Sequence, residues 1–160
     1  MDMLKLVLAK ILLGYILQSI TYVLGVYAVN KRKIDIKLFS IATLIFSLAT
    51  YAIRETGWIK IDFGVHTLLL LMVIILLGVG LLKNNIYPTA LAAIIVSLSV
   101  IISETVTALC VSSILGSNNV EKFFANEFNK AAAVIPANLA LFAIVYYVYK
   151  LRTRNQNGEK

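Results

Sequence analysis

The stretch IYPTALAAIIVSLSVIISETVTALCVSSIL, from Ile86 to Leu115, decides the fold of this chain, and it contains a single charged side chain, that of Glu104. A helix rises about 1.5 Å per residue and the hydrocarbon core of a bilayer is about 30 Å thick, so about 20 apolar residues cross it. In lipid the backbone must satisfy its own hydrogen bonds, which favours a helix. The stretch therefore predicts a transmembrane helix that is tilted or that protrudes from the bilayer.

Four further apolar blocks flank this stretch: Ile11–Val29, Leu38–Ile53, Val65–Leu82 and Ala131–Tyr149. The chain of 160 residues is 60% hydrophobic and 14% charged, and its mean hydropathy is +0.87. A soluble domain of this size could not cover so much apolar surface with so few polar side chains. We therefore predict an all-α, polytopic membrane protein with five transmembrane helices.

The blocks and their connections use the whole chain, so we expect residues 1–150 to form the five-helix transmembrane domain and residues 151–160 a basic cytoplasmic tail. The connections are too short for a soluble catalytic module, and the scattered glycines form no phosphate-binding loop. The single cysteine, Cys110, and the single histidine, His66, argue against a zinc site made by this chain alone. We expect no enzyme and no cofactor.

The connections carry local signals. The second block should extend to Ile36, and the very short connection Lys83–Pro88 predicts an antiparallel hairpin with Pro88 in the first turn of the fourth helix. The apolar residues of Gly116–Lys130 recur with a helical period, which predicts an amphipathic helix on the outer surface; a partly ordered loop is the alternative. Pro136 then lies inside the fifth block, where a proline can kink a helix.

Positive charge is distributed unequally between the two sides of a five-span chain. Nine Lys and Arg residues belong to the first and third connections and the tail, against six on the opposite side. The nine are Lys31, Arg32, Lys33, Lys37, Lys83, Lys150, Arg152, Arg154 and Lys160. Because Lys and Arg are enriched in cytoplasmic loops, we predict a multi-pass protein of the cell membrane with its N-terminus outside and its C-terminus in the cytoplasm. The net charge of +7 thus gives no reason to expect nucleic acid as a partner.

Glu104 requires an explanation, because an ionised carboxylate in the middle of a membrane helix costs about 3 kcal/mol or more unless it faces protein or water or is paired. Helical spacing places small residues on its face and on one face of the first block, which would let the two helices approach closely. These residues are Ala93, Ser97 and Ala108 on the fourth block and Gly14, Gln18, Thr21 and Gly25 on the first.

We therefore predict a polar cluster of Gln18, Arg54, His66 and Glu104 in the outer half of the bundle. Arg54 ends the second block and can reach inward along its long stem, while His66 begins the third. Ionisable groups inside a membrane are functional by default, which favours ligand or proton binding. The alternatives are a structural role, with interhelical hydrogen bonds of about 0.6 kcal/mol each, and a subunit interface.

The run FGVHTLL, residues 63–69, is similar to an FGIHT-type motif in the N-terminal membrane domains of GHKL-type sensor histidine kinases of Firmicutes. The order of features agrees as well: a basic turn after the first helix, Arg54 late in the second, the pair Ser103-Glu104 in the fourth and the segment Phe124–Pro136 before the fifth. The resemblance implies a sensory domain that forms homodimers, with Arg54, His66 and Glu104 as matching polar positions. The phospho-acceptor histidine and the ATP-binding motif of that family are absent, so no kinase activity is expected.

We therefore expect a non-enzymatic sensory or regulatory membrane module that binds a small or peptide ligand in the outer half of the bundle and signals through the fifth helix and the tail. One alternative is a small oligomeric transporter or channel subunit that uses Glu104 for proton or ion coupling. Another is a lipid-interacting assembly protein. The expected partners are the lipid bilayer, the ligand and a second copy of the chain.

The orientation can be tested by labelling single introduced cysteines with a membrane-impermeant thiol reagent, in a chain whose Cys110 has been replaced. We expect Lys33→Cys to react only from the cytoplasmic side and Lys122→Cys only from outside, because the predicted topology puts them on opposite faces of the membrane. Reaction of Lys33→Cys in intact cells would overturn this orientation.

Overall fold

The computed structural model describes residues 14–55, 63–116, 119, 122–123, 125 and 127–158. This described part is all-α and contains no strand, which confirms the all-α part of the predicted fold class. Its helices are α2 Leu17–Val29, α3 Ile36–Glu55, α4 Phe63–Leu76, η2 Leu77–Leu81, α5 Ile86–Leu115 and α7 Glu127–Gly158. The element η2 is a π-helical turn that directly follows α4.

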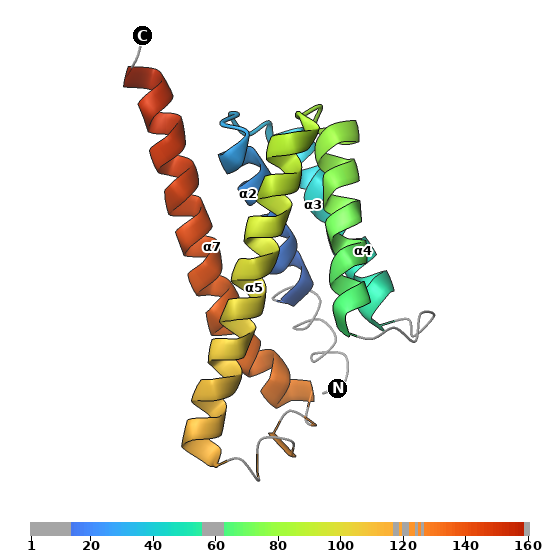
Figure 1. The fold of residues 1–160 in the computed structure, drawn as a ribbon, viewed down its shortest axis with the longest axis vertical. Coiled ribbons are helices and arrows are strands. Elements are labelled where there is room, and N and C mark those ends of the chain that lie inside the picture. The colour runs from blue at the N-terminus through green and yellow to red at the C-terminus, as the bar shows by residue number, and fades with distance from the viewer. Residues whose placement is uncertain are drawn as a thin grey trace.

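The helix boundaries follow local signals in the sequence. As predicted, α3 begins at Ile36, because the Oδ1 of Asp35 accepts a hydrogen bond from the backbone N–H of Lys37 at 2.9 Å and so caps the helix. Pro88 lies in the first turn of α5, and Pro136 lies inside α7, both as predicted. The N-terminal part of α7 bends (Figure 1), and Pro136, which lacks the N–H for a bond to the preceding turn, accounts for the bend.

The fifth helix is longer than the apolar block Ala131–Tyr149 suggested. It begins at Glu127, inside the segment predicted to lie on the membrane surface, and continues to Gly158 through most of the basic tail. Lys, Arg, Leu and Gln are good helix formers, so polarity alone does not end the helix. The rest of the predicted surface helix, Gly116–Lys130, falls mostly outside the described residues.

Successive long helices run in opposite directions (Figure 1). The helices α2, α4 and α7 run one way and α3 and α5 the other, so α4–η2 and α5 form the predicted antiparallel hairpin. The helix α2 contacts α3, α5 and α7, while α4 packs on α3 and α5. At one end α5 extends beyond α2, α3 and α4, and at the other end α7 does so.

The central helix is α2, in which every residue from Thr21 to Ala28 is buried. Gly25 allows α5 and α7 to approach it closely: a Cβ at this position would lie 2.5 Å from Cγ2 of Val96 and 4.0 Å from Cγ1 of Val145. The predicted small-residue face of this helix therefore does pack against α5. Gly14, at the other end of that face, has no neighbour within 4 Å of the same position.

The outside of the bundle is rich in large apolar side chains, and several polar residues lie inside beside the apolar core. Polar residues are buried between the helices, among them Gln18, Thr50, Ser97 and Asn138. Large apolar side chains such as Leu76, at 69% exposed, cover the outside. Burial in a soluble core would hide such residues, because each buried Leu side chain contributes about 1.5–3 kcal/mol.

Two helices are long and apolar enough to cross a membrane: Ile36–Arg54, of 19 residues, and Ile86–Leu115, of 30 residues. Only 28% and 17% of their most apolar windows are buried in the protein, whereas the core helix of a soluble protein would be mostly buried. Two shorter apolar helices cover Gly14–Val29 and His66–Leu81. The exposed apolar faces of the two long helices are typical of surfaces that meet lipid or another protein.

Arg32 fastens the turn after α2 to the hairpin of α4–η2 and α5. Its Nη1 donates hydrogen bonds to the carbonyl oxygen of Leu82 at 2.7 Å, to that of Lys83 at 3.2 Å and to Oδ1 of Asn84 at 2.9 Å. The carbonyls at a helix C-terminus carry partial negative charge, so a cation there is stabilising. This end of the bundle is therefore held by charge-assisted hydrogen bonds.

The close approach at Gly25 generates a stability prediction. We expect Gly25→Ala to lower the free energy of unfolding by about 1–3 kcal/mol, because the added methyl group meets the stiff, buried side chain of Val96. Gly14→Ala, at a position with open space, is the matched control and should be neutral or slightly stabilising. Thermal unfolding in detergent measures both, and equal stability of the two variants would contradict close packing at Gly25.

Candidate functional site

The contact between α2 and α5 sets the level of the polar residues in the bundle. Two hydrogen bonds define their antiparallel register: Tyr22 to Ser97, at 2.8 Å between the two hydroxyls, and Asn30 to Thr89, at 3.4 Å. Each helix advances eight residues between these two bonds, so the register is constant. If the register is continued by seven residues past the bond between Tyr22 and Ser97, Tyr15 lies level with Glu104. Glu104 is then on the same face of α5 as Ser97.

The helix α7 runs parallel to α2 and has its own constant register. Gly25 faces Val145, so one heptad earlier on the same faces Gln18 lies opposite Asn138. Both amide side chains are buried, with Gln18 6% exposed and Asn138 5% exposed. Within the described part of the chain, neither amide has a hydrogen-bond partner. By this register, two residues whose amides lack hydrogen-bond partners share one level at the interface of α2 and α7.

Glu104 and its neighbour Ser103 bring α5 to the same level. Ser103 lies one heptad beyond Val96, the residue that packs on Gly25, and both Ser103 and Glu104 are half-buried. We call Gln18, Ser103, Glu104 and Asn138 the polar layer. Each amide offers two donors and an acceptor, and the hydroxyl and the carboxylate add acceptors. Such a set can hold a ligand that has both kinds of hydrogen-bonding group.

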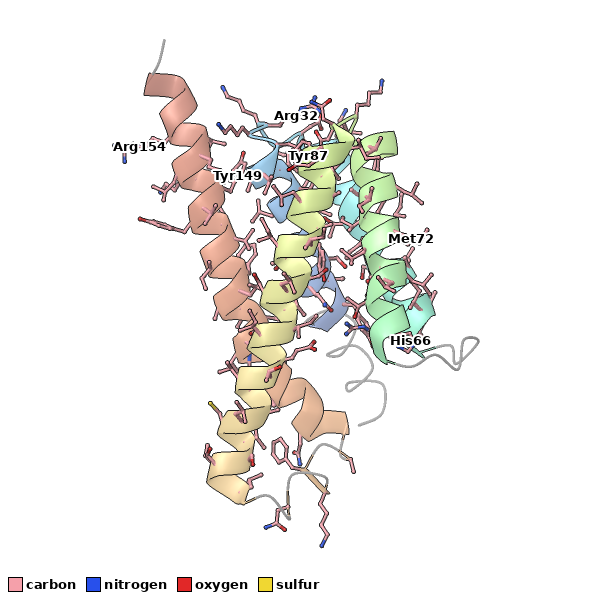
Figure 2. The ribbon with its side chains drawn as sticks, in the orientation of Figure 1. Arg32, His66, Met72, Tyr87, Tyr149 and Arg154 are labelled. Carbon is pink, nitrogen blue, oxygen red and sulfur yellow. The ribbon has the colours of Figure 1, made fainter. Side chains whose placement is uncertain are left out.

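The other two predicted site residues lie near the same end of the bundle but on other helices. Arg54 is exposed near the end of α3, and its charge, like that of Glu104, is close enough to the buried Tyr22 hydroxyl to act on it. His66 is half-buried at the beginning of α4 (Figure 2). Among the described residues, no hydrogen bond or ion pair joins any two of Gln18, Arg54, His66 and Glu104. A single four-residue cluster therefore stays a prediction.

Asn138 is the buried polar residue that sequence analysis missed. It stands in the apolar block Ala131–Tyr149 two residues after Pro136, and the proline suggests only a kink. The criterion that selects Glu104, a polar group inside a membrane helix, applies to Asn138 as well. The sequence contained the signal, but nothing in it showed that Asn138 would face Gln18.

At the opposite end of the bundle, α7 is held by two long hydrogen bonds. The Tyr149 hydroxyl accepts from the backbone N–H of Ile34 at 3.3 Å, and Nη1 of Arg152 donates to the carbonyl oxygen of Ala28 at 3.4 Å. Both are longer than the usual N–H···O distance of about 2.9 Å and are therefore weak. The bonds of Arg32 to the hairpin are shorter, at 2.7 and 2.9 Å, so at this end the hydrogen bonds to α7 are weaker than those to the hairpin.

No protein-family model matches the chain, and no curated protein or solved structure matches it either. The likeness of residues 63–69 to sensor-kinase membrane domains thus stays a prediction from the sequence. Within the described residues, no three His, Cys, Asp or Glu side chains form a group that could hold a metal ion. The chemistry of the polar layer follows from its own amide, hydroxyl and carboxylate groups.

The register of α2 and α7 can be tested by cross-linking. In a chain whose Cys110 has been replaced, we expect Gln18→Cys with Asn138→Cys to be joined by a short bis-thiol reagent, because the two positions face each other. Gln18→Cys with Leu139→Cys is the control, since Leu139 is 50% exposed on the outer side of α7. The cross-link is read as protection of both thiols and as an added mass. Equal cross-linking of the two pairs would refute the register.

Proposed function

We propose that the protein is a non-enzymatic sensory or regulatory module of the membrane, in which five helices cross the bilayer and the polar layer binds a small or peptide ligand. The helix α5 is long and apolar enough to cross a membrane, and its contacts with neighbouring helices support a crossing by those helices as well. The pair α4–η2 forms a hairpin with α5, and α2 and α7 pack along it, so all of them would share the depth of α5 in the membrane. The connections between these helices are too short to let one of them lie away from the bundle.

The placement of charge supports the predicted orientation. Eight of the nine cations assigned to the cytoplasm belong to the turn after α2, the first turn of α3, the connection before α5 and the C-terminal part of α7. These segments meet at one end of the bundle, where Figure 2 labels Arg32 and Arg154. The ninth, Lys160, lies outside the described residues. The polar layer then lies toward the opposite, outer side, where an extracellular ligand could reach it.

The observation that carries the proposal is the pair of unpartnered amides, Gln18 and Asn138. Among the described residues, the fully enclosed side-chain polar atoms without a partner belong to Thr43 and Asn84, so the amide atoms of Gln18 and Asn138 keep some accessible surface. If the two amides served only to join α2 to α7, they would bond to each other or to the backbone, and in the described part they do neither. Their donors and acceptors, next to Glu104, therefore suit a ligand that has an apolar body and a few polar groups.

Transmission would pass through α7. This helix carries Asn138 in the polar layer and, about four turns further on, Arg152 and Tyr149 at the basic end. A ligand that moves Asn138 would move the whole helix, and the two long hydrogen bonds at Ala28 and Ile34 offer little resistance. The readable output is the position of the C-terminal part of α7 relative to the turn after α2.

The proposal can be tested with a defined library of short apolar peptides and small apolar acids and amides. We expect one class of compound to raise the melting temperature of the reconstituted protein, because a ligand at 100 times its Kd adds about 2.7 kcal/mol of stability. We expect no shift in the double variant Gln18→Leu, Asn138→Leu. The control is Thr43→Val, which also removes a buried polar group without a hydrogen bond, but on α3.

The same liposomes separate this proposal from transport. A sensor should show no flux of the stabilising compound and no proton flux. The movement of the C-terminal part of α7 relative to the turn after α2 should increase in proportion to binding. A pH-dependent flux that is abolished by Glu104→Gln would instead identify a transporter or channel subunit and would contradict the sensory proposal.

A further inference from the structure

A ring of positive charge surrounds the end of the bundle opposite the polar layer. Six of its cations make no side-chain hydrogen bond or ion pair within the described part of the chain, and all six are exposed. We call them the basic rim: Lys31, Lys33, Lys37, Lys83, Lys150 and Arg154. Asp35 is the acidic residue described at this end, and its Oδ1 is engaged in capping α3. Within the described residues, the rim cations thus have no acidic side chain as a partner and are open to anions from outside the protein.

Exposed aromatic and aliphatic side chains lie directly beside the basic rim. Tyr87 is 78% exposed in the first turn of α5, and Tyr147 is 62% exposed one turn before Lys150. Ile36, at 78% exposed, is the neighbour of Lys37. Figure 2 shows Tyr87 and Tyr149 at the same end as Arg32 and Arg154. Tyr at such positions is typical of the boundary between acyl chains and headgroups, so the cations beyond it lie at the depth of lipid phosphates.

We propose that the basic rim binds the phosphate groups of anionic phospholipids, and that these lipids hold α7 against the turn after α2. The rim cations come from four separate segments, namely the turn after α2, the first turn of α3, the connection before α5 and the C-terminal part of α7. Charge spread over separate segments suits several lipid headgroups better than a single soluble acidic protein. Lys150 and Arg154 belong to α7, whereas Lys31 and Lys33 belong to the turn, so one phosphate between them would bridge the two elements.

A bridging phosphate would strengthen the contact between α7 and the turn after α2, whose own hydrogen bonds are long. The turn and α7 are joined by the bonds of Tyr149 and Arg152, at 3.3 and 3.4 Å, and the repulsion between the cations of the two elements opposes this contact. An anion between like charges turns that repulsion into attraction. The lipid composition of the inner leaflet would therefore set how firmly α7 is held. This inference rests on the membrane placement of the proposed function but not on its ligand.

The test uses the whole protein in nanodiscs that contain equal amounts of phosphatidylglycerol and phosphatidylcholine, with the co-purified lipids identified by native mass spectrometry. We expect the wild type to retain phosphatidylglycerol about fivefold or more over phosphatidylcholine, since each cation near an anionic surface favours it by about fivefold. The variant Lys31→Gln, Lys33→Gln, Lys83→Gln, Lys150→Gln should retain both lipids equally. The same four positions changed to Arg, which keep the charge, should retain the preference.

A second readout tests the bridge itself. Spin labels on Lys33→Cys and Arg154→Cys, with Cys110 replaced, should show a narrower distance distribution in phosphatidylglycerol than in phosphatidylcholine. Equal retention of both lipids by the wild type would overturn the proposal, as would displacement of phosphatidylglycerol by 10 mM inorganic phosphate, which would indicate a site for soluble anions. Either result leaves the ligand site untouched, whereas extraction of the protein by alkaline carbonate would end both proposals.

Discussion

The approach of α5 and α7 to α2 at Gly25 is the constraint on which the rest of the structure depends. With no Cβ at this position, Val96 and Val145 reach the central helix, and the Tyr22 hydroxyl meets that of Ser97 one turn away. Dispersion contacts over a short distance and one buried hydrogen bond are the forces that hold helices together where lipid competes for apolar surface. Because helices are rigid, this single contact determines which residues share each level above and below it.

One heptad from that contact, the same faces present polar groups in place of small apolar ones. Gln18 lies one heptad from Gly25, Asn138 one heptad from Val145, and Glu104 one heptad from Ser97. A tightly packed layer is therefore followed by one whose donors and acceptors have no partners in the described part of the chain. A protein that needed only stability would gain by placing apolar side chains there. In the proposed function the polar layer binds the ligand, and the tight layer beside it would keep that surface in position.

Two elements are held differently at the basic end of the bundle. The hairpin of α4–η2 and α5 is fastened by the short, charge-assisted bonds of Arg32, while α7 is joined by two long bonds and approaches a surface of like charge. The helix that carries Asn138 is therefore joined at the basic end by weaker hydrogen bonds than the hairpin is. A ligand in the outer half and anionic lipid in the inner half would act on the same movable element from opposite sides of the membrane.

Much of the fold could be predicted from the residues alone, because the apolar blocks, Pro88 and the cap at Asp35 act locally. The limits of α7 could not, since its polar ends contain good helix formers and depend on what they contact. The four predicted site residues were chosen from the face and depth of each helix, which accounts for Gln18 and Glu104 sharing a layer.

The sequence by itself determined the helices, their order, the accumulation of positive charge on one side and the presence of polar groups inside apolar blocks. The tertiary structure decided which of those groups meet, because the register between two helices depends on side-chain packing at points such as Gly25 and not on the periodicity of either helix. The register places Asn138 at the level of Gln18, and Arg54 and His66 lie on other helices near the same end.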